Sequence, residues 1–144
     1  MNLLIIAFIA IKIFTPLSTN NFKVLAETST SFAKCRMPSF EEAYQESKAI
    51  FVGKVLSERK EGDDKIFKIR VEKYWKGKQS KIVEVSYYET MRYQAWFQVG
   101  GRYLVYARGN DDGTLSDGRC SQTKKYSEAK DDLKKLGKGK IVKK

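Results

Sequence analysis

The sequence KIFKIRVEKYW, residues 65–75, indicates the fold class more clearly than any other stretch of the chain. Apolar and charged side chains alternate along it, and the apolar positions include Phe67, Ile69 and Val71. A period of two is typical of a β-strand that buries one face and exposes the other. We therefore predict a strand over residues 65–75 whose apolar side chains point into a core.

Four further stretches predict strands before and after this one. They are residues 49–56, 82–87, 102–107 and, more weakly, 114–120. Gly53 interrupts the first of them, which predicts a bulge or bend. Turn-forming residues at 61–64 and 110–113 separate neighbouring strands. Five short strands fit a small closed barrel, because closure removes the exposed edges of a sheet.

Two segments carry the signals of helix ends. Ser39 and Glu42 match a capping box, in which each side chain accepts a hydrogen bond from the other residue's backbone, and this predicts a helix to about Lys48. The second segment begins with Ser127 as a cap, continues with acidic and then basic residues, and ends at Gly137. Its expected buried stripe is Ala129, Leu133 and Leu136. The chain is therefore expected to be mostly β, with flanking helices.

The composition favours a binding protein over an enzyme. Lysine and arginine outnumber aspartate and glutamate by 28 to 17, and the net charge of +11 favours anionic partners, although excess lysine can simply keep a protein soluble. The chain has no histidine and only two cysteines, so common metal sites and the commonest general base are missing. Neighbouring carboxylates at 63–64, 111–112 and 131–132 lie in predicted turns or at a helix start, where they cap the backbone. We expect no catalysis, cofactor or metal.

The start of the chain has the features of an export signal. Residues 3–14 are apolar except for Lys12, and a run of this length is short for a transmembrane helix. Small residues ending at Ala26 suit signal peptidase, so we predict a signal peptide over residues 1–26, with a second candidate cleavage position after Ala33. An uncleaved anchor and a buried structural segment are the alternatives. Once the signal is cleaved, no stable membrane span is expected.

Export would place the two cysteines in an oxidising space. Cys35 and Cys120 bracket most of the predicted strands, so we expect a disulfide that ties the two ends of this region together. A reactive thiol is the alternative, but no histidine or basic helix terminus lies near either cysteine in the sequence to favour the thiolate. Residues 27–34 are mostly small and polar and are expected to form a loose leader. The protein is expected to be secreted or associated with the cell envelope.

A series of short motifs follows a fixed order through the rest of the chain. The motifs are Cys35 with Pro38, Glu42–Ala43, Ile50–Val55, Val71–Gly77, Val83–Val85, Phe97 with Gly100, Tyr103–Ala107, Cys120 with Thr123, and Asp132–Gly137. The series resembles the netrin-like family, whose best-known members are the tissue inhibitors of metalloproteinases, and it is most similar to the bacterial members. The resemblance implies a five-stranded OB-type closed barrel over residues 35–137, with a short N-terminal helix and a C-terminal helix. A Lys-rich tail, residues 138–144, would follow.

The cysteine pattern departs from that of the family. Members usually carry a Cys-x-Cys near the mature start and a further cysteine just before the position that matches Phe97. Here Ala33 stands at the first of these positions, and no cysteine lies between Cys35 and Cys120. The resemblance implies that one family bridge has lost both partners together, while the other is kept as Cys35–Cys120.

The resemblance also implies a non-enzymatic binding domain, with proteinase inhibition as an alternative. In the inhibitors, the α-amine and carbonyl of an N-terminal cysteine chelate the zinc of the enzyme. Cleavage directly before Cys35 would leave Lys34 at the last position of the signal, which signal peptidase disfavours. Inhibition of a metalloproteinase would therefore use a surface ridge, for which the candidates are Cys35, Arg36, Met37 and Pro38.

Two other sets of side chains are candidate binding surfaces. The first would stack on sugar rings or bases, unless these rings only cap the core: Tyr87, Tyr88, Tyr93, Trp96 and Phe97. The second would hold an anionic cell-surface polymer, unless it is only a solvated helix face and tail: Lys124, Lys125, Lys130, Lys134, Lys135, Lys138, Lys140, Lys143 and Lys144. Export argues against nucleic acid as a partner.

Overall fold

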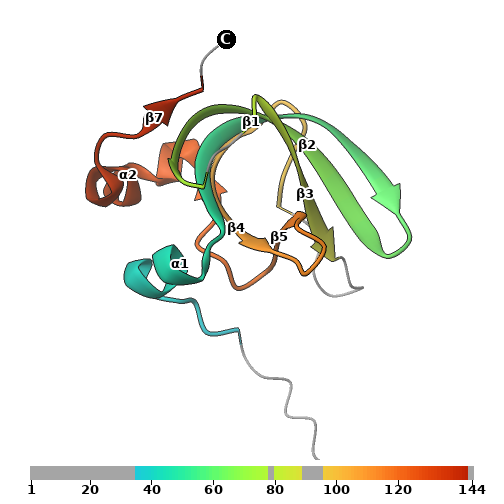
Figure 1. The fold of residues 1–144 in the computed structure, drawn as a ribbon, viewed down its shortest axis with the longest axis horizontal. Coiled ribbons are helices and arrows are strands. Elements are labelled where there is room, and N and C mark those ends of the chain that lie inside the picture. Colours follow the sequence, from blue (N-terminus) through green and yellow to red (C-terminus); the bar gives the residue numbers. More distant parts are fainter. Residues whose placement is uncertain (1–34, 78–79, 89–95, 143–144) are drawn as a thin grey trace, which may run out of the picture. The chain divides into compact units, whose positions relative to one another are not determined.

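The computed structural model describes residues 35–77, 80–88 and 96–142, which belong to one compact unit of the chain. Figure 1 shows the strands curving around a barrel, with two helices outside it. The elements are α1 (Phe40–Glu46), β1 (Ala49–Glu61), β2 (Asp64–Lys76), β3 (Ile82–Tyr88), β4 (Arg102–Gly109), β5 (Leu115–Asp117), β6 (Lys124–Lys125), the 3-10 turn η1 (Tyr126–Glu128), α2 (Lys130–Leu136) and β7 (Lys140–Ile141). The predicted class, mostly β with two flanking helices, is confirmed. No helix in the described ranges is long and apolar enough to cross a membrane.

Five strands close the barrel in the order β1–β2–β3–β5–β4, and β4 pairs with β1 to complete the circle. Within the described residues, β3 and β5 run parallel and the other neighbours in the circle are antiparallel. This mixed order is that of the OB-type barrel which the sequence analysis predicts. The two-residue strands β6 and β7 pair with β4 and β2 outside this circle.

The barrel interior is filled by apolar side chains that alternate along the strands. Phe67, Ile69 and Val71 of β2 are buried there, as the alternation predicts. They belong to one cluster with Ala49, Phe51, Val55, Val85, Tyr87, Phe97, Tyr103, Val105 and Ala107. Because removing apolar surface from water is the dominant favourable term in folding, this cluster stabilises the closed barrel.

Gly53 lies where β1 bends. The register between β1 and β2 shifts between Val52 and Gly53, so the predicted irregularity is confirmed. A Cβ atom at position 53 would lie 2.6 Å from Cγ2 of Ile69 and 2.8 Å from the carbonyl oxygen of Arg70. Contacts this short leave no room for a side chain, so glycine allows β1 to approach β2 closely here.

A second apolar cluster lies on the outside of the barrel, under the two helices. The outward side chains of β1 and β4 that it buries are Ile50, Val52, Leu104 and Tyr106. Ala43 of α1 and residues at or near α2 cover them, the latter being Ala129, Leu133 and Leu136. The indole nitrogen of Trp75 donates to the carbonyl of Gly137 at 3.0 Å and so ties the end of α2 to β2. This cover stops short of the other outward residues of the same strands, which are exposed.

The two helices begin differently. At α1, the Ser39 amide donates to Oε2 of Glu42 at 2.7 Å and the Glu42 amide donates to Oγ of Ser39 at 3.2 Å, so the predicted capping box is confirmed. At α2, the predicted Ser127 cap is wrong, because Ser127 belongs to η1 and Ala129 caps the helix without a side-chain hydrogen bond. Ala129 is fully buried in the outer cluster. Tertiary packing therefore fixes where this helix begins.

Three sequence predictions need correction at their ends. β1 continues to Glu61 and β2 starts at Asp64, because the two arms go on pairing with each other as a hairpin. β5 contains only the three residues Leu115–Asp117, because the chain then turns away toward the disulfide. Part of the predicted Lys-rich tail forms the short strand β7, where Lys140 pairs with Tyr74 of β2.

Candidate functional site

The two cysteines form the predicted disulfide. The Sγ atoms of Cys35 and Cys120 are 2.05 Å apart, and their Cα atoms are 5.6 Å apart. The bridge joins the segment before α1 to the segment after β5, across 85 positions of the chain. Both thiols are consumed in the bridge, so the alternative of a reactive thiol does not apply to this oxidised form.

The ridge, Cys35 to Pro38, is exposed along most of its length but tethered at several points. Nη2 of Arg36 lies 2.7 Å from Oε1 of Glu42, and this partner raises the pKa of Arg36. The pKa of Glu42 is lowered, first by the backbone amide at the helix cap and then by Arg36. At the other end, the side-chain amide of Gln122 donates to the carbonyl of Pro38. The ridge is therefore held against the barrel through both α1 and the segment that follows β5.

The predicted signal peptide and leader lie outside the described residues. The same is true of both candidate cleavage positions, Ala26 and Ala33. Cleavage and export therefore stay predictions from the sequence.

The residues of the predicted aromatic surface do not all lie on the same side of the barrel wall. Tyr87 and Phe97 point into the interior and are 2% and 3% exposed. Tyr88 and Trp96 are 63% and 44% exposed, and Tyr93 lies outside the described residues. Because successive residues of a strand point to opposite faces, Tyr87 and Tyr88 do not share a surface. The five rings therefore do not form one stacking platform.

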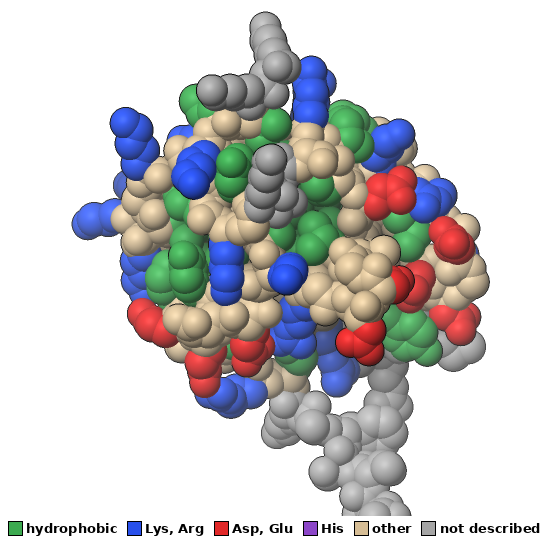
Figure 2. Space-filling model, in the orientation of Figure 1, with side chains coloured by type: hydrophobic (Ala, Val, Ile, Leu, Met, Phe, Trp, Pro, Cys, Tyr) green, Lys and Arg blue, Asp and Glu red, His purple; other side chains and the backbone are tan. Residues whose placement is uncertain are grey.

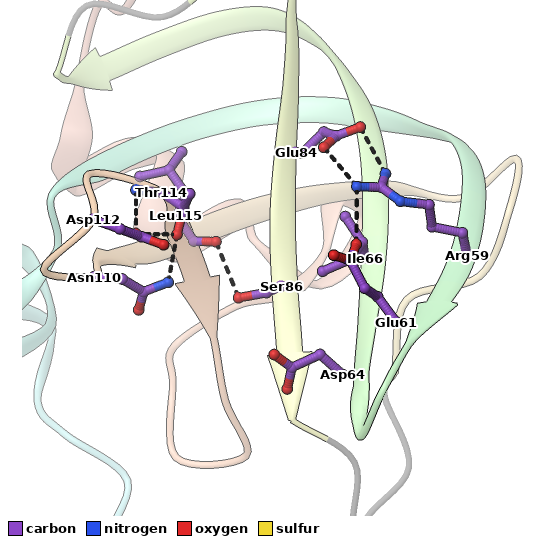
Figure 3. A pocket seen from close by; sticks show the side chains of 10 residues that line it. All are labelled: Arg59, Glu61, Asp64, Ile66, Glu84, Ser86, Asn110, Asp112, Thr114 and Leu115. Carbon is purple, nitrogen blue, oxygen red and sulfur yellow. Dashed lines mark hydrogen bonds and ion pairs between the residues drawn. The ribbon is translucent and has the colours of Figure 1, made fainter.

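A pocket of about 360 Å³ lies between the β1–β2 hairpin and the turn that joins β4 to β5 (Figure 3). We call it the carboxylate pocket, after its acidic lining residues Glu61, Asp64, Glu84 and Asp112. Nη1 of Arg59 lies 2.7 Å from Oε1 of Glu84, and Nη2 lies 3.0 Å from Oε2. This two-point contact lowers the pKa of Glu84. Nη2 of Arg59 also lies 3.4 Å from Oε2 of Glu61.

The turn between β4 and β5, on the other side of the pocket, forms hydrogen bonds among its own polar groups. The hydroxyl and the amide of Thr114 donate to Oδ1 of Asp112 at 2.6 and 2.9 Å, and these bonds lower the pKa of Asp112. Nδ2 of the Asn110 side chain donates to Oγ1 of Thr114 at 2.8 Å. Asp64 has no bond to the other labelled residues in Figure 3. In the described part of the chain, no three His, Cys, Asp or Glu side chains are grouped so that they could hold a metal ion.

One buried carboxylate, that of Asp117 in β5, lacks a full set of hydrogen-bond partners. Asp117 of β5 pairs with Tyr87 of β3, so its side chain lies on the inward face of the barrel. Its Oδ1 accepts a hydrogen bond from the Gly118 amide at 2.8 Å, whereas its buried Oδ2 has no partner. Burial raises the pKa of Asp117 to about 6, although the nearby hydroxyls of Ser121 and Thr123 oppose this shift.

The predicted basic surface is spread over several elements. Figure 2 shows Lys and Arg side chains at the left, around α2 and β7, whereas many Asp and Glu side chains gather on the hairpin side at the right. Lys124 lies 2.9 Å from Asp132, and Lys135 lies 5.0 Å from the ring centre of Phe40. Residues 143–144 are not described. The other predicted lysines are exposed: Lys125, Lys130, Lys134, Lys138 and Lys140.

A more ordered group of cations, which the sequence analysis missed, lies on the outer face of the barrel. Lys54 of β1 pairs with Arg70 of β2 on one side and with Arg102 of β4 on the other. All three side chains are exposed, next to buried residues that point inward. Because directly opposite residues have Cβ atoms roughly 5 Å apart, the three cations stand side by side. We call these three residues the cation row.

Arg102, at one end of the cation row, is held by neighbouring side chains, whereas the other two cations are not. Nε and Nη2 of Arg102 lie 2.7 and 2.6 Å from Oε2 of Glu72, and the Arg102 guanidinium lies 3.7 Å from the ring centre of Tyr126. Among the residues that the structure describes, Lys54 and Arg70 have no hydrogen bond or ion pair through their side chains. Like charges directly opposite each other destabilise a sheet. The cation row therefore carries charge that the protein leaves largely unbalanced.

No family model matches this chain, and no curated protein matches it. The netrin-like resemblance and the functions that it implies therefore remain proposals. Two surfaces are taken as candidates for binding: the tethered ridge, which is exposed and fixed, and the cation row, in which two of three cations have no partner among the described residues.

Proposed function

We propose that this protein is an exported, non-enzymatic binding domain of the netrin-like type, which recognises a partner protein through the ridge. The observation that carries the proposal is that the ridge is both exposed and fixed. A segment that is already held in one shape loses less conformational entropy when a partner binds. The tethers of the ridge therefore favour binding without contributing any contact to the partner.

The ridge also presents suitable chemistry. Met37 is 50% exposed between the tethered residues Arg36 and Pro38. A methionine side chain is apolar and adapts its shape to the surface that it meets, and both methionine and arginine are enriched in protein interfaces. An apolar contact beside a positioned charge is therefore available at the tip of the ridge.

The disulfide supports the exported location in this proposal. Disulfides form and persist in oxidising spaces, and they are rare in the cytosol. The Cys35–Cys120 bridge is consistent with a secreted or envelope-associated protein, as is the apolar start of the chain. An exported location implies that the partner protein of the ridge also lies outside the cell.

A proteinase is the second candidate partner, favoured by the resemblance and by the constrained shape of the ridge. Inhibition would use the ridge as a rigid segment that occupies the enzyme's cleft. Zinc chelation by an amino-terminal Cys35 would require cleavage after Lys34, which signal peptidase disfavours. This candidate therefore depends on the side chains of Arg36 and Met37.

Site-specific cross-linking tests the proposal in the exported, oxidised protein. A photo-reactive amino acid at Met37 should form a covalent adduct with one protein outside the cell. The same group at Glu128, an exposed residue of η1, serves as the control and should give no such adduct. Equal adducts from both positions, or none from position 37, would contradict a ridge-directed partner.

An inhibition assay tests the proteinase alternative. If a metalloproteinase is inhibited, Met37→Asp should weaken inhibition by about tenfold or more, as expected for a central contact residue. Glu128→Lys should leave inhibition unchanged. Sequencing of the mature amino terminus completes the test, because a start at Cys35 would indicate zinc chelation in place of the ridge mechanism.

A further inference from the structure

We propose that the cation row is a second binding site, separate from the ridge, and that it takes a linear, base-free polymer carrying phosphate groups. The three residues come from three neighbouring strands, β1, β2 and β4, and none of them belongs to the ridge. The proposal goes beyond the proposed function, because neither the ridge nor its partner enters the argument.

The cation row stands on the open part of the outer barrel face. Neighbouring outward residues of β1 and β4, Val52 and Leu104, are 2% and 0% exposed beneath the outer apolar cluster. Lys54 and Arg102 follow on the same face and are exposed. The row therefore begins where the cover formed by the helices ends, and a long ligand can lie across it.

The charge of the row is not balanced within the protein. Three cations are accompanied by one described counter-charge, the Glu72 carboxylate on Arg102, which leaves 3 − 1 = +2. Directly opposite like charges destabilise the free protein. A ligand that neutralises them binds the folded state alone and therefore stabilises it.

The types and spacing of the cations favour phosphate groups on a polymer. Each guanidinium presents a planar fork of donors that matches phosphate oxygens, and the lysine between the two arginines acts as a point charge. Three strands about 4.8 Å apart place the outer members of the row about 10 Å from each other. A row of this length spans more than one anionic group, so a polymer fits it better than a single ion does.

The ring next to the row favours a polymer without bases. The Arg102 guanidinium lies 3.7 Å from the ring centre of Tyr126 and so covers it. This ring also packs against the outer apolar cluster. Single-stranded nucleic acids bind proteins largely by stacking bases on free rings. Because the Tyr126 ring is already occupied, charge is the feature of the row that is left to recognise the ligand.

Binding of labelled inorganic polyphosphate to the oxidised, exported chain tests the proposal. With three phosphate contacts, the logarithm of the association constant should fall against the logarithm of salt concentration with a slope of about −2, taking roughly 0.7 per contact as for a single strand. Affinity should therefore fall roughly 20-fold between 50 and 200 mM salt. No binding at 50 mM salt would overturn the proposal.

A matched pair of double variants locates the site. Lys54→Gln with Arg70→Gln should flatten the slope to about −0.7, because one contact remains. Lys134→Gln with Lys138→Gln removes the same net charge from exposed positions near the C-terminus and should leave the slope near −2. An equal loss in both double variants would show that overall charge, and not the row, binds the polymer.

A third variant separates a binding role from a structural one. Glu72→Gln removes the counter-charge that competes for Arg102, so polyphosphate should bind several-fold more tightly. If the row had only a structural role, removing its ion pair with Glu72 would not improve the binding of polyphosphate. Unchanged or weaker binding would contradict the competing role that we assign to Glu72.

Binding assays with two further phosphate-bearing ligands distinguish the possible sources of phosphate. Single-stranded DNA and vesicles of anionic phospholipid should bind more weakly than polyphosphate at the same phosphate concentration. Tighter binding to DNA would show that bases contribute, and tighter binding to vesicles would assign the row to a membrane surface. Either result would overturn the base-free polymer as the ligand.

Discussion

The carboxylate pocket and the cation row are both groups of like charge on the outside of one barrel, and they differ in how many of the charged groups have a partner within the protein. In the pocket, Arg59 contacts Glu84 at two points and Thr114 donates twice to Asp112. In the row, Lys54 and Arg70 stand opposite each other, without a partner in the described part of the chain. Both groups keep a net charge, because the pocket sets one arginine against four carboxylates and the row sets three cations against one carboxylate. The difference lies in hydrogen bonding within the protein, which positions charges in the pocket and leaves two cations of the row open to a ligand.

The greatest loss of stability is expected from the disulfide, whose cysteines belong to neither the pocket nor the row. Replacing both Cys35 and Cys120 by serine should lower the free energy of unfolding by about 4–5 kcal/mol, because the bridge closes a loop of roughly 85 residues in the unfolded chain. Denaturant unfolding measures the change, and reduction of the wild-type protein should reproduce it. An unchanged unfolding midpoint would show that the bridge does not stabilise the fold.

Hydrogen exchange on the same double variant measures how far the loss of the bridge spreads through the barrel. The residues next to the bridge, at the end of β5, should exchange faster, because their tether to the ridge is lost. The strands that carry the cation row should change less, because the bridge does not reach them. Equal acceleration in both regions would mean that the barrel responds as one unit.

The second prediction concerns the buried carboxylate of Asp117, which has one oxygen without a hydrogen-bond partner. The folded pKa of Asp117 is raised from 3.8 to about 6, so between these values the folded state binds more protons than the unfolded state. The contribution of Asp117 to stability should therefore fall as the pH rises from about 4 to 6 and then level off, by up to roughly 3 kcal/mol.

Asp117→Asn tests this dependence directly. An asparagine keeps an acceptor for the Gly118 amide but does not ionise, so the variant should be more stable than wild type at pH 7.5 and should lose the fall between pH 4 and 6. Urea unfolding at a series of pH values measures both effects. Asp111→Asn, at an exposed position, should retain the fall. A wild-type profile that rises from pH 4 to 6 and is unchanged by Asp117→Asn would refute the assignment.

The third prediction removes the arginine that pairs with two carboxylates of the carboxylate pocket. Arg59→Gln should return the lowered pKa of Glu84 toward its ordinary value, because the largest cause of the shift is the bond from Arg59. The stabilisation from this pair is present above the unfolded pKa of Glu84 and is lost on acidification, so the variant should be slightly less stable at pH 7 and equal to wild type near pH 2. An NMR titration of Glu84 measures the shift. Lys60→Gln, at a neighbouring exposed position, should leave the titration unchanged.

The smallest effect is expected when the cation row is partly neutralised. Lys54→Gln should raise the free energy of unfolding by about 0.2–1 kcal/mol at low salt, because it removes the central charge between Arg70 and Arg102. The gain should disappear near 1 M salt, where the screening length is about 3 Å. Thermal unfolding at both salt concentrations measures it, with Lys134→Gln as the control. A destabilised Lys54→Gln variant would show that the row is balanced after all.

Much of the fold could be predicted from short segments of sequence. The alternation around Phe67 identified a strand and its inward face, and Gly53 marked the bend in β1. Ser39 and Glu42 identified the start of α1, because a capping box depends on residues only three positions apart. The same local reasoning failed at Ser127, because the burial of Ala129 against distant strands determines where α2 begins.

The candidate sites were predicted less completely. Cys35 and Cys120 could be paired from the sequence because the chain contains no other cysteine. The aromatic set could not be interpreted, because neighbouring rings such as Tyr87 and Tyr88 lie on opposite sides of the barrel wall. The lysines near the C-terminus were predicted to form one surface because they are close in sequence, although the row of opposed cations lies on β1, β2 and β4.

Local sequence patterns were sufficient to predict the five barrel strands, although not all of their ends, together with the first helix, the bend in β1 and the covalent bridge. Each of these depends on residues within one element or on the only available partner. Which charges face one another depends on how the strands pair in the folded barrel. Lys54, Arg70 and Arg102 become neighbours only when β1 has paired with both β2 and β4, and pairing across a closed barrel is set by the packing of the whole core.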